Sequence, residues 1–124
     1  MSFEIAITWE GSEKFKDDAR QRAQRASDFT PLTSRFRSVF GEQYQRWFAI
    51  YPIGGESNTL QKSLTPPDIV RAHGTEVVVG TDVDYAPFYA EYLRARGREL
   101  VPFTGPIVDA FTDTVLDWIL EGHN

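Results

Sequence analysis

Side chains that could do acid–base or metal chemistry are few in this sequence. The two histidines are His73, in a predicted turn, and His123, near the last residue. Asp82 and Asp84 lie two residues apart and could hold a divalent cation together with a third carboxylate. We favour a plainer interpretation, in which Asp82 bonds to its own turn and Asp84 caps a helix. The sequence contains no phosphate-binding loop, zinc-protease motif, nucleophile elbow or cysteine, and it therefore predicts no catalytic site, metal or cofactor.

An aromatic stripe is the first feature that suggests an interaction surface. Its members follow helical spacing, at i, i+3, i+4 and i+7: Tyr85, Phe88, Tyr89 and Tyr92. Such a stripe can belong to a hydrophobic core. Three of its four members carry a hydroxyl, however, which needs water or a partner. A half-exposed tyrosine face is typical of protein–protein contacts, so we take these four residues as interface candidates.

Two charged groups are further interface candidates. Four acids recur at every fourth residue, where like charges repel: Asp109, Asp113, Asp117 and Glu121. They could form a solvated face, could meet basic residues of a neighbouring subunit (Arg20, Arg22 and Arg25), or could line a channel that lets DNA pass. Three arginines surround Gly97: Arg94, Arg96 and Arg98. They form either ordinary surface or the salt-bridge partners of the acids in an adjacent copy.

Periodicity predicts the elements that must position these residues. A period of two indicates a strand over 3–9, and apolar residues at three- and four-residue steps indicate a strong helix over 30–50. The full predicted order is a strand (3–9), helices (12–27 and 30–50), a β-hairpin (69–80), a short helix (85–95), an edge strand (99–103) and a C-terminal helix (106–121). This order predicts a small α+β protein with a single domain over residues 1–124.

Residues 51–67 are predicted to be a long mobile loop because they are rich in proline and glycine. Such a loop could become ordered on meeting a partner. Its apolar side chains would then be buried against that partner. On this hypothesis Tyr51, Ile53 and Leu60 join the interface candidates.

Charge and hydropathy limit the partners. The chain has 124 residues and a formal net charge of −5, which disfavours a protein that grips the nucleic-acid backbone. Residues 1–50 carry a charge of +1 and residues 51–124 carry −6, so copies of the chain could pair head to tail. The longest aliphatic run is Val77-Val78-Val79, and the first residues contain neither a basic segment nor an apolar run. We therefore expect a soluble intracellular protein without a membrane partner.

Two stretches contain short motifs in a fixed order. The first is Asn58-Thr59-Leu60-Gln61-Lys62-Ser63-Leu64, and the second runs from Val77 to Phe88 and includes Val79-Gly80-Thr81 and Tyr85-Ala86. Both stretches resemble the tail-completion, or head–tail joining, proteins of tailed phages, which are also called virion morphogenesis or minor capsid proteins. Gly97, Pro102-Phe103 and the final helix follow in the order of that family. The sequence departs from the family pattern at Asn58, in place of glycine, and at Val101, in place of arginine. The resemblance covers residues 58–121.

The resemblance implies a structural virion protein that is not an enzyme. Such proteins form a ring, often sixfold, in the phage neck, after assembly in the cytoplasm of the host cell. The expected partners are copies of the chain itself, a head connector or stopper protein, a tail terminator or tail tube protein, and double-stranded DNA that passes through the lumen without specific binding. One alternative is a tail terminator that caps the tail tube. An alternative of another class is an intracellular regulatory module that binds a protein as a dimer or heterocomplex.

Overall fold

The protein is a small α+β molecule, as predicted, and its helices pack on a three-stranded antiparallel sheet. The computed structural model describes residues 2–53 and 58–122, so His123 lies outside the described residues. The strands are β1 (Phe3–Thr8), β2 (Ile69–His73) and β3 (Glu76–Thr81), in the spatial order β1-β3-β2. The α-helices are α1 (Arg20–Ser27), α2 (Thr33–Ile50), α3 (Asn58–Lys62), α4 (Ala86–Arg94) and α5 (Pro106–Glu121). Two short 3₁₀ helices, Gly11–Phe15 and Thr30–Leu32, precede α1 and α2.

The sheet has one buried face, as the period of two in its strands requires. In the register, Val79 of the central strand lies between Ile5 of β1 and Val70 of β2. Val70, Val77 and Val79 are buried. On the opposite face, Arg71 of β2 donates to Glu4 of β1 at 2.7 Å, across the central strand. The predicted N-terminal strand and hairpin are confirmed.

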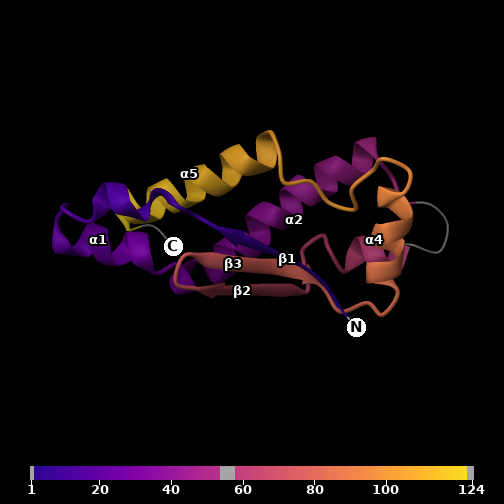
Figure 1. Cartoon of the computed structure of the whole chain (residues 1–124), viewed down its shortest axis with the longest axis horizontal. Coiled ribbons are helices and arrows are strands. Elements are labelled where there is room, and N and C mark those ends of the chain that lie inside the picture. The colour runs from indigo at the N-terminus through magenta and orange to yellow at the C-terminus, as the bar shows by residue number, and fades with distance from the viewer. Residues whose placement is uncertain (1, 54–57, 123–124) are drawn as a thin grey trace.

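An aromatic core joins the two long helices. In Figure 1, α5 runs along the molecule above the sheet, and α2 crosses from behind the strands toward the end where α4 lies. The ring of Phe111 on α5 lies 5.5 Å from that of Phe36 and 6.1 Å from that of Phe40, both on α2. These three side chains are buried. The predicted helix over 106–121 is therefore confirmed, and the one over 30–50 is confirmed from Thr33 onward, after a first turn that is 3₁₀. Their apolar faces meet each other.

The predicted helix over 12–27 is wrong in its first half. The chain forms a 3₁₀ helix over Gly11–Phe15, and α1 begins only at Arg20. The hydroxyl of Ser12 donates to the carbonyl oxygen of Ala26 at 2.8 Å. The ring of Phe15 lies 6.1 Å from that of Trp9. These tertiary contacts hold the segment in a tight turn.

The predicted edge strand over 99–103 is also wrong, since this segment pairs with none of the described strands. Leu100 and Val101 are buried against the helices. The indole N–H of Trp47 on α2 donates to the carbonyl oxygen of Leu100 at 3.2 Å. Because Pro102 has no N–H to offer a neighbouring strand, packing on α2 prevails over strand pairing.

The predicted long loop over 51–67 is wrong for much of its described part. It contains α3, and an isolated bridge joins Leu64 to Pro67. Ile53 and Leu60, expected to await a partner, are 6% and 0% exposed and belong to the core of the chain itself. Both are therefore removed from the interface candidates. Residues 54–57 lie outside the described residues.

Candidate functional site: an aromatic and basic contact face

The aromatic stripe lies on the outer face of α4. Phe88, Tyr92 and Tyr85 are 60%, 50% and 41% exposed, whereas Tyr89 is half-buried and packs against the core. The opposite face of α4 is buried through Ala86, Ala90 and Leu93. The side chains of this buried face are small or aliphatic, so the helix can lie close to the body of the protein. A core role is therefore excluded for Tyr85, Phe88 and Tyr92.

A buried polar junction fixes the segment that leads into α4. The hydroxyl of Thr81, at the end of β3, donates to the hydroxyl of Ser63 at 2.7 Å, and Ser63 in turn donates to the carbonyl oxygen of Leu60 at 2.7 Å. The Thr81 hydroxyl also accepts from the backbone N–H of Val83 at 3.2 Å. Ser63 and Thr81, which lie in the two stretches that resemble the phage family, therefore help to position α4.

The residue that caps the N-terminal end of α4 differs from the prediction, whereas the glycine after its C-terminal end has the expected conformation. Tyr85, rather than the expected Asp84, occupies the N-cap position. At the other end Gly97 has a φ of 75°, as expected for a helix terminator, and the N–H of Arg98 donates to the carbonyl oxygen of Leu93 at 2.9 Å. The chain reverses at this point, so the arginines lie next to the stripe.

The three arginines have different surroundings. The guanidinium of Arg96 lies 3.8 Å from the centre of the Tyr92 ring, so it continues the aromatic stripe. Arg94 forms an exposed ion pair with Glu99 at 3.7 Å. Arg98 is half-buried, its guanidinium lies 5.5 Å from the centre of the Tyr51 ring, and its Nε is buried without a hydrogen-bond partner among the described residues. Arg94 and Arg96 therefore lie at the surface, and Arg98 is partly a packing residue.

An apolar groove lies at the C-terminal end of α2. It has a volume of about 440 Å³ and lies between the C-terminal end of α2 and the segment that leads into α5. Its apolar walls are Trp47, Ile50, Tyr51, Pro102, Pro106 and Ile107. Ile50 is 69% exposed. The groove was not predicted, because residues 99–103 were expected to form an edge strand rather than to pack beside α2.

Exposed apolar side chains gather at one end of the molecule. Figure 1 shows α4 and the C-terminal end of α2 at the same end. Five of the six large hydrophobic side chains that are exposed in the described part of the chain lie on these two segments: Ile50, Tyr51, Tyr85, Phe88 and Tyr92. The sixth is Leu120 in the last turn of α5. We call Tyr85, Phe88, Tyr92, Arg94 and Arg96 the α4 face.

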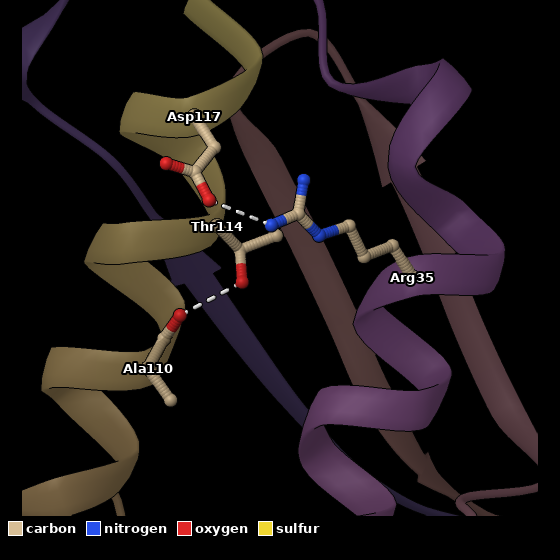
Figure 2. Close-up of polar contacts among 4 residues, drawn as sticks. All are labelled: Arg35, Ala110, Thr114 and Asp117. Carbon is tan, nitrogen blue, oxygen red and sulfur yellow. Dashed lines mark hydrogen bonds and ion pairs between the residues drawn. The ribbon is translucent and has the colours of Figure 1, made fainter. Parts of the chain in front are cut away.

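The acidic stripe is only partly available for a partner. Figure 2 shows Asp117 on α5 accepting from Arg35 on α2 at 2.8 Å, with Thr114 between the two helices donating to the carbonyl oxygen of Ala110. Asp117 therefore joins two helices of its own chain, and the expected pairing with an adjacent copy is revised for this residue. Asp109, Asp113 and Glu121 are exposed.

Two of the three arginines of α1 make contacts within their own chain. Arg25 donates from Nε to the carbonyl oxygen of Ile119 at 3.0 Å, and Arg22 lies 3.9 Å from Asp18. We therefore remove Arg25 from the basic surface that was expected to meet the acids of a neighbouring subunit.

Titratable groups with shifted pKa values lie away from the α4 face. Hydrogen bonds from the hydroxyl and then the backbone N–H of Thr30 lower the pKa of Asp28. Burial raises the pKa of the Tyr44 phenol well above its ordinary value of 10.0.

Over residues 2–53 and 58–122, no group of three or more histidine or acidic side chains is arranged to hold a metal ion. Asp82, Asp84 and His73 are exposed.

Comparisons with known proteins leave the function open. No family model, curated protein or solved structure matches the chain. The similarity to phage tail-completion proteins stays a prediction from the motifs. In the part of the chain that the structure describes, no helix combines the length and the apolar character that crossing a bilayer requires.

Proposed function

We propose that this chain is a structural subunit of a tailed-phage neck, where copies of it form a ring that joins the head connector to the tail. The observation that carries the proposal is the α4 face, where three large aromatic side chains lie exposed on one helix. Aromatic residues and arginine are enriched in protein–protein interfaces. The motifs that resemble tail-completion proteins hold this helix in place through Ser63 and Thr81.

The size of the exposed aromatic surface indicates that two copies alone would associate weakly, whereas a closed ring would be stable. An aromatic side chain presents 150–250 Å², so the exposed parts of Tyr51, Tyr85, Phe88 and Tyr92 amount to roughly 400 Å². Burying that area stabilises a contact by about 10 kcal/mol. Association itself costs about 4–15 kcal/mol. A single contact is therefore weak, while a closed ring gives every subunit two contacts.

The net charge fits a ring through which DNA moves. Each copy contributes a formal charge of −5, so a lumen built from this chain would not hold the negatively charged DNA backbone. We therefore expect rings that do not retain double-stranded DNA at physiological salt.

Native mass spectrometry and negative-stain imaging over a series of protein concentrations test the proposal. We expect closed rings with one copy number and a central opening at high concentration, and monomers at low concentration. The combined substitution Tyr85→Ser, Phe88→Ser and Tyr92→Ser should keep the protein monomeric with an unchanged circular dichroism spectrum. Leu120→Ser is the matched control, because Leu120 is also exposed (43%) but lies on α5, away from the α4 face.

Other outcomes would contradict the proposal. A stable dimer without rings would favour the intracellular regulatory module, and a monomer at every concentration would contradict self-assembly. Tight binding of double-stranded DNA by the rings, measured by fluorescence anisotropy, would contradict a lumen that lets DNA slide.

A further inference from the structure

We propose that the apolar groove between α2 and α5 receives Phe88 of a second copy of this chain. This inference rests on the proposed function, because it names the two surfaces through which neighbouring subunits meet. The α4 face and the groove are different surfaces, so a contact between them is heterologous. Repeated heterologous contacts close into a ring when the rotation between subunits allows it.

The groove has the walls and the size to receive an aromatic side chain. Trp47, Ile50 and Tyr51 line it from α2, and the rings of Trp47 and Tyr51 lie 4.4 Å apart. Pro102, Pro106 and Ile107 form the other wall. Its volume of about 440 Å³ is in the range of pockets that bind small molecules, so it can take one aromatic ring and part of a neighbouring one.

Phe88 has the chemistry of the occupant. It is 60% exposed and is the most exposed aromatic side chain among the described residues. It has no hydroxyl that would need a partner inside an apolar groove. Tyr85 and Tyr92, one turn before and after it, carry hydroxyls that can reach the polar rim, where Thr104 and Arg46 line the groove.

Charge supports the choice of a second copy as the partner. Beyond Phe88, the exposed cation Arg94 ends α4 and Arg96 follows it, whereas α5 continues from the groove with the exposed acids Asp109 and Asp113. At 1.5 Å per residue, Phe88 and Arg94 are about 9 Å apart along α4, and Pro106 and Asp113 are about 10 Å apart along α5. When Phe88 of one copy lies in the groove of another and α4 runs in the same direction as α5, the arginines come within reach of the acids.

Cross-linking between two single-cysteine variants tests this arrangement, and the natural absence of cysteine makes the reaction clean. Glu91→Cys places a thiol beside Phe88 on α4, and Thr104→Cys places one at the rim of the groove; both positions are exposed. The two variants, one of them labelled with ¹⁵N, are mixed at a concentration that gives oligomers and treated with a short bis-maleimide. We expect a mixed product at twice the chain mass of 14.1 kDa.

Two controls show that the product depends on the proposed contact. Adding Phe88→Ala to the Glu91→Cys chain should reduce the mixed product at least tenfold, and because Phe88 is exposed the fold should not change. Gln21→Cys on α1, used in place of Thr104→Cys, should give no more product than the background reaction at low concentration.

The possible results separate this inference from the proposed function. Rings without a mixed product, or with Glu91→Cys linked only to itself, would overturn the groove as the receiving site while leaving self-assembly intact. A mixed product that persists at full yield after Phe88→Ala would overturn Phe88 as the occupant. The absence of both oligomers and cross-links would overturn the inference together with the proposed function.

Discussion

Replacing Thr81 with valine should destabilise the protein by removing the buried junction beneath α4. Valine keeps the shape of threonine but cannot donate to Ser63 or accept from the N–H of Val83, the two hydrogen bonds that the Thr81 hydroxyl makes. Each intramolecular hydrogen bond contributes about 1 kcal/mol, and a buried group that is left unsatisfied costs more. We expect a loss of about 2–3 kcal/mol in the free energy of unfolding, or a decrease of about 8–12 °C in Tm at this chain length.

Urea denaturation followed by tryptophan fluorescence and circular dichroism measures this loss. Thr81→Ser is the matched control, because it keeps the hydroxyl and removes only a methyl group, at a cost of about 1 kcal/mol. The double variant Ser63→Ala, Thr81→Val should lose about 1 kcal/mol less than the sum of its single variants, since neither partner is then left unsatisfied. Equal losses for Thr81→Val and Thr81→Ser would refute the reasoning, and so would strict additivity in the double variant.

Two further predictions concern the fold. Gly80→Ala should cost about 2–4 kcal/mol in urea denaturation, because its new methyl group would overlap the backbone of Phe3 on β1, whereas Gly97→Ala has open space and should cost only about 1–2 kcal/mol for its positive φ. Stability should also fall at both extremes of pH. The lowered pKa of Asp28 adds stability that is present above the ordinary pKa of 3.8 and is lost as the pH falls through the folded value, and Asp28→Asn should remove this dependence. The raised pKa of Tyr44 adds stability that is present below pH 10.0 and is lost at higher pH, and Tyr44→Phe should flatten that limb in a pH series of urea midpoints.

Local patterns predicted most of the secondary structure. The periodic apolar residues of 30–50 and 106–121 gave helices, and the hairpin around Gly74 formed as expected. The errors lie where tertiary contacts prevail over local preference. Leu100 packs on α2 through Trp47, which no propensity at 99–103 reveals. The five residues of α3 are too few to show a helical period.

The candidate site could be predicted only in part. The spacing of the aromatic stripe gave its helix, but spacing alone left a core role open. A signal for exposure was present in the sequence, because Ala86, Ala90 and Leu93 share the other face of the same helix and suffice to bury it. The groove could not be predicted, because Trp47 and Pro106 are far apart in the sequence and meet only through the packing of α2 and α5.

The docking of α1 on the last turns of α5 has a practical consequence for labelling. The indole N–H of Trp118 donates to the carbonyl oxygens of Arg25 and Asp28 at 3.1 and 3.0 Å, which ties these two helices together. Figure 1 shows this pair at the end of the molecule opposite α4, while β1 begins near α4. A fluorescent protein or affinity tag fused after α5 would therefore leave the α4 face accessible, whereas the same fusion before β1 would crowd it.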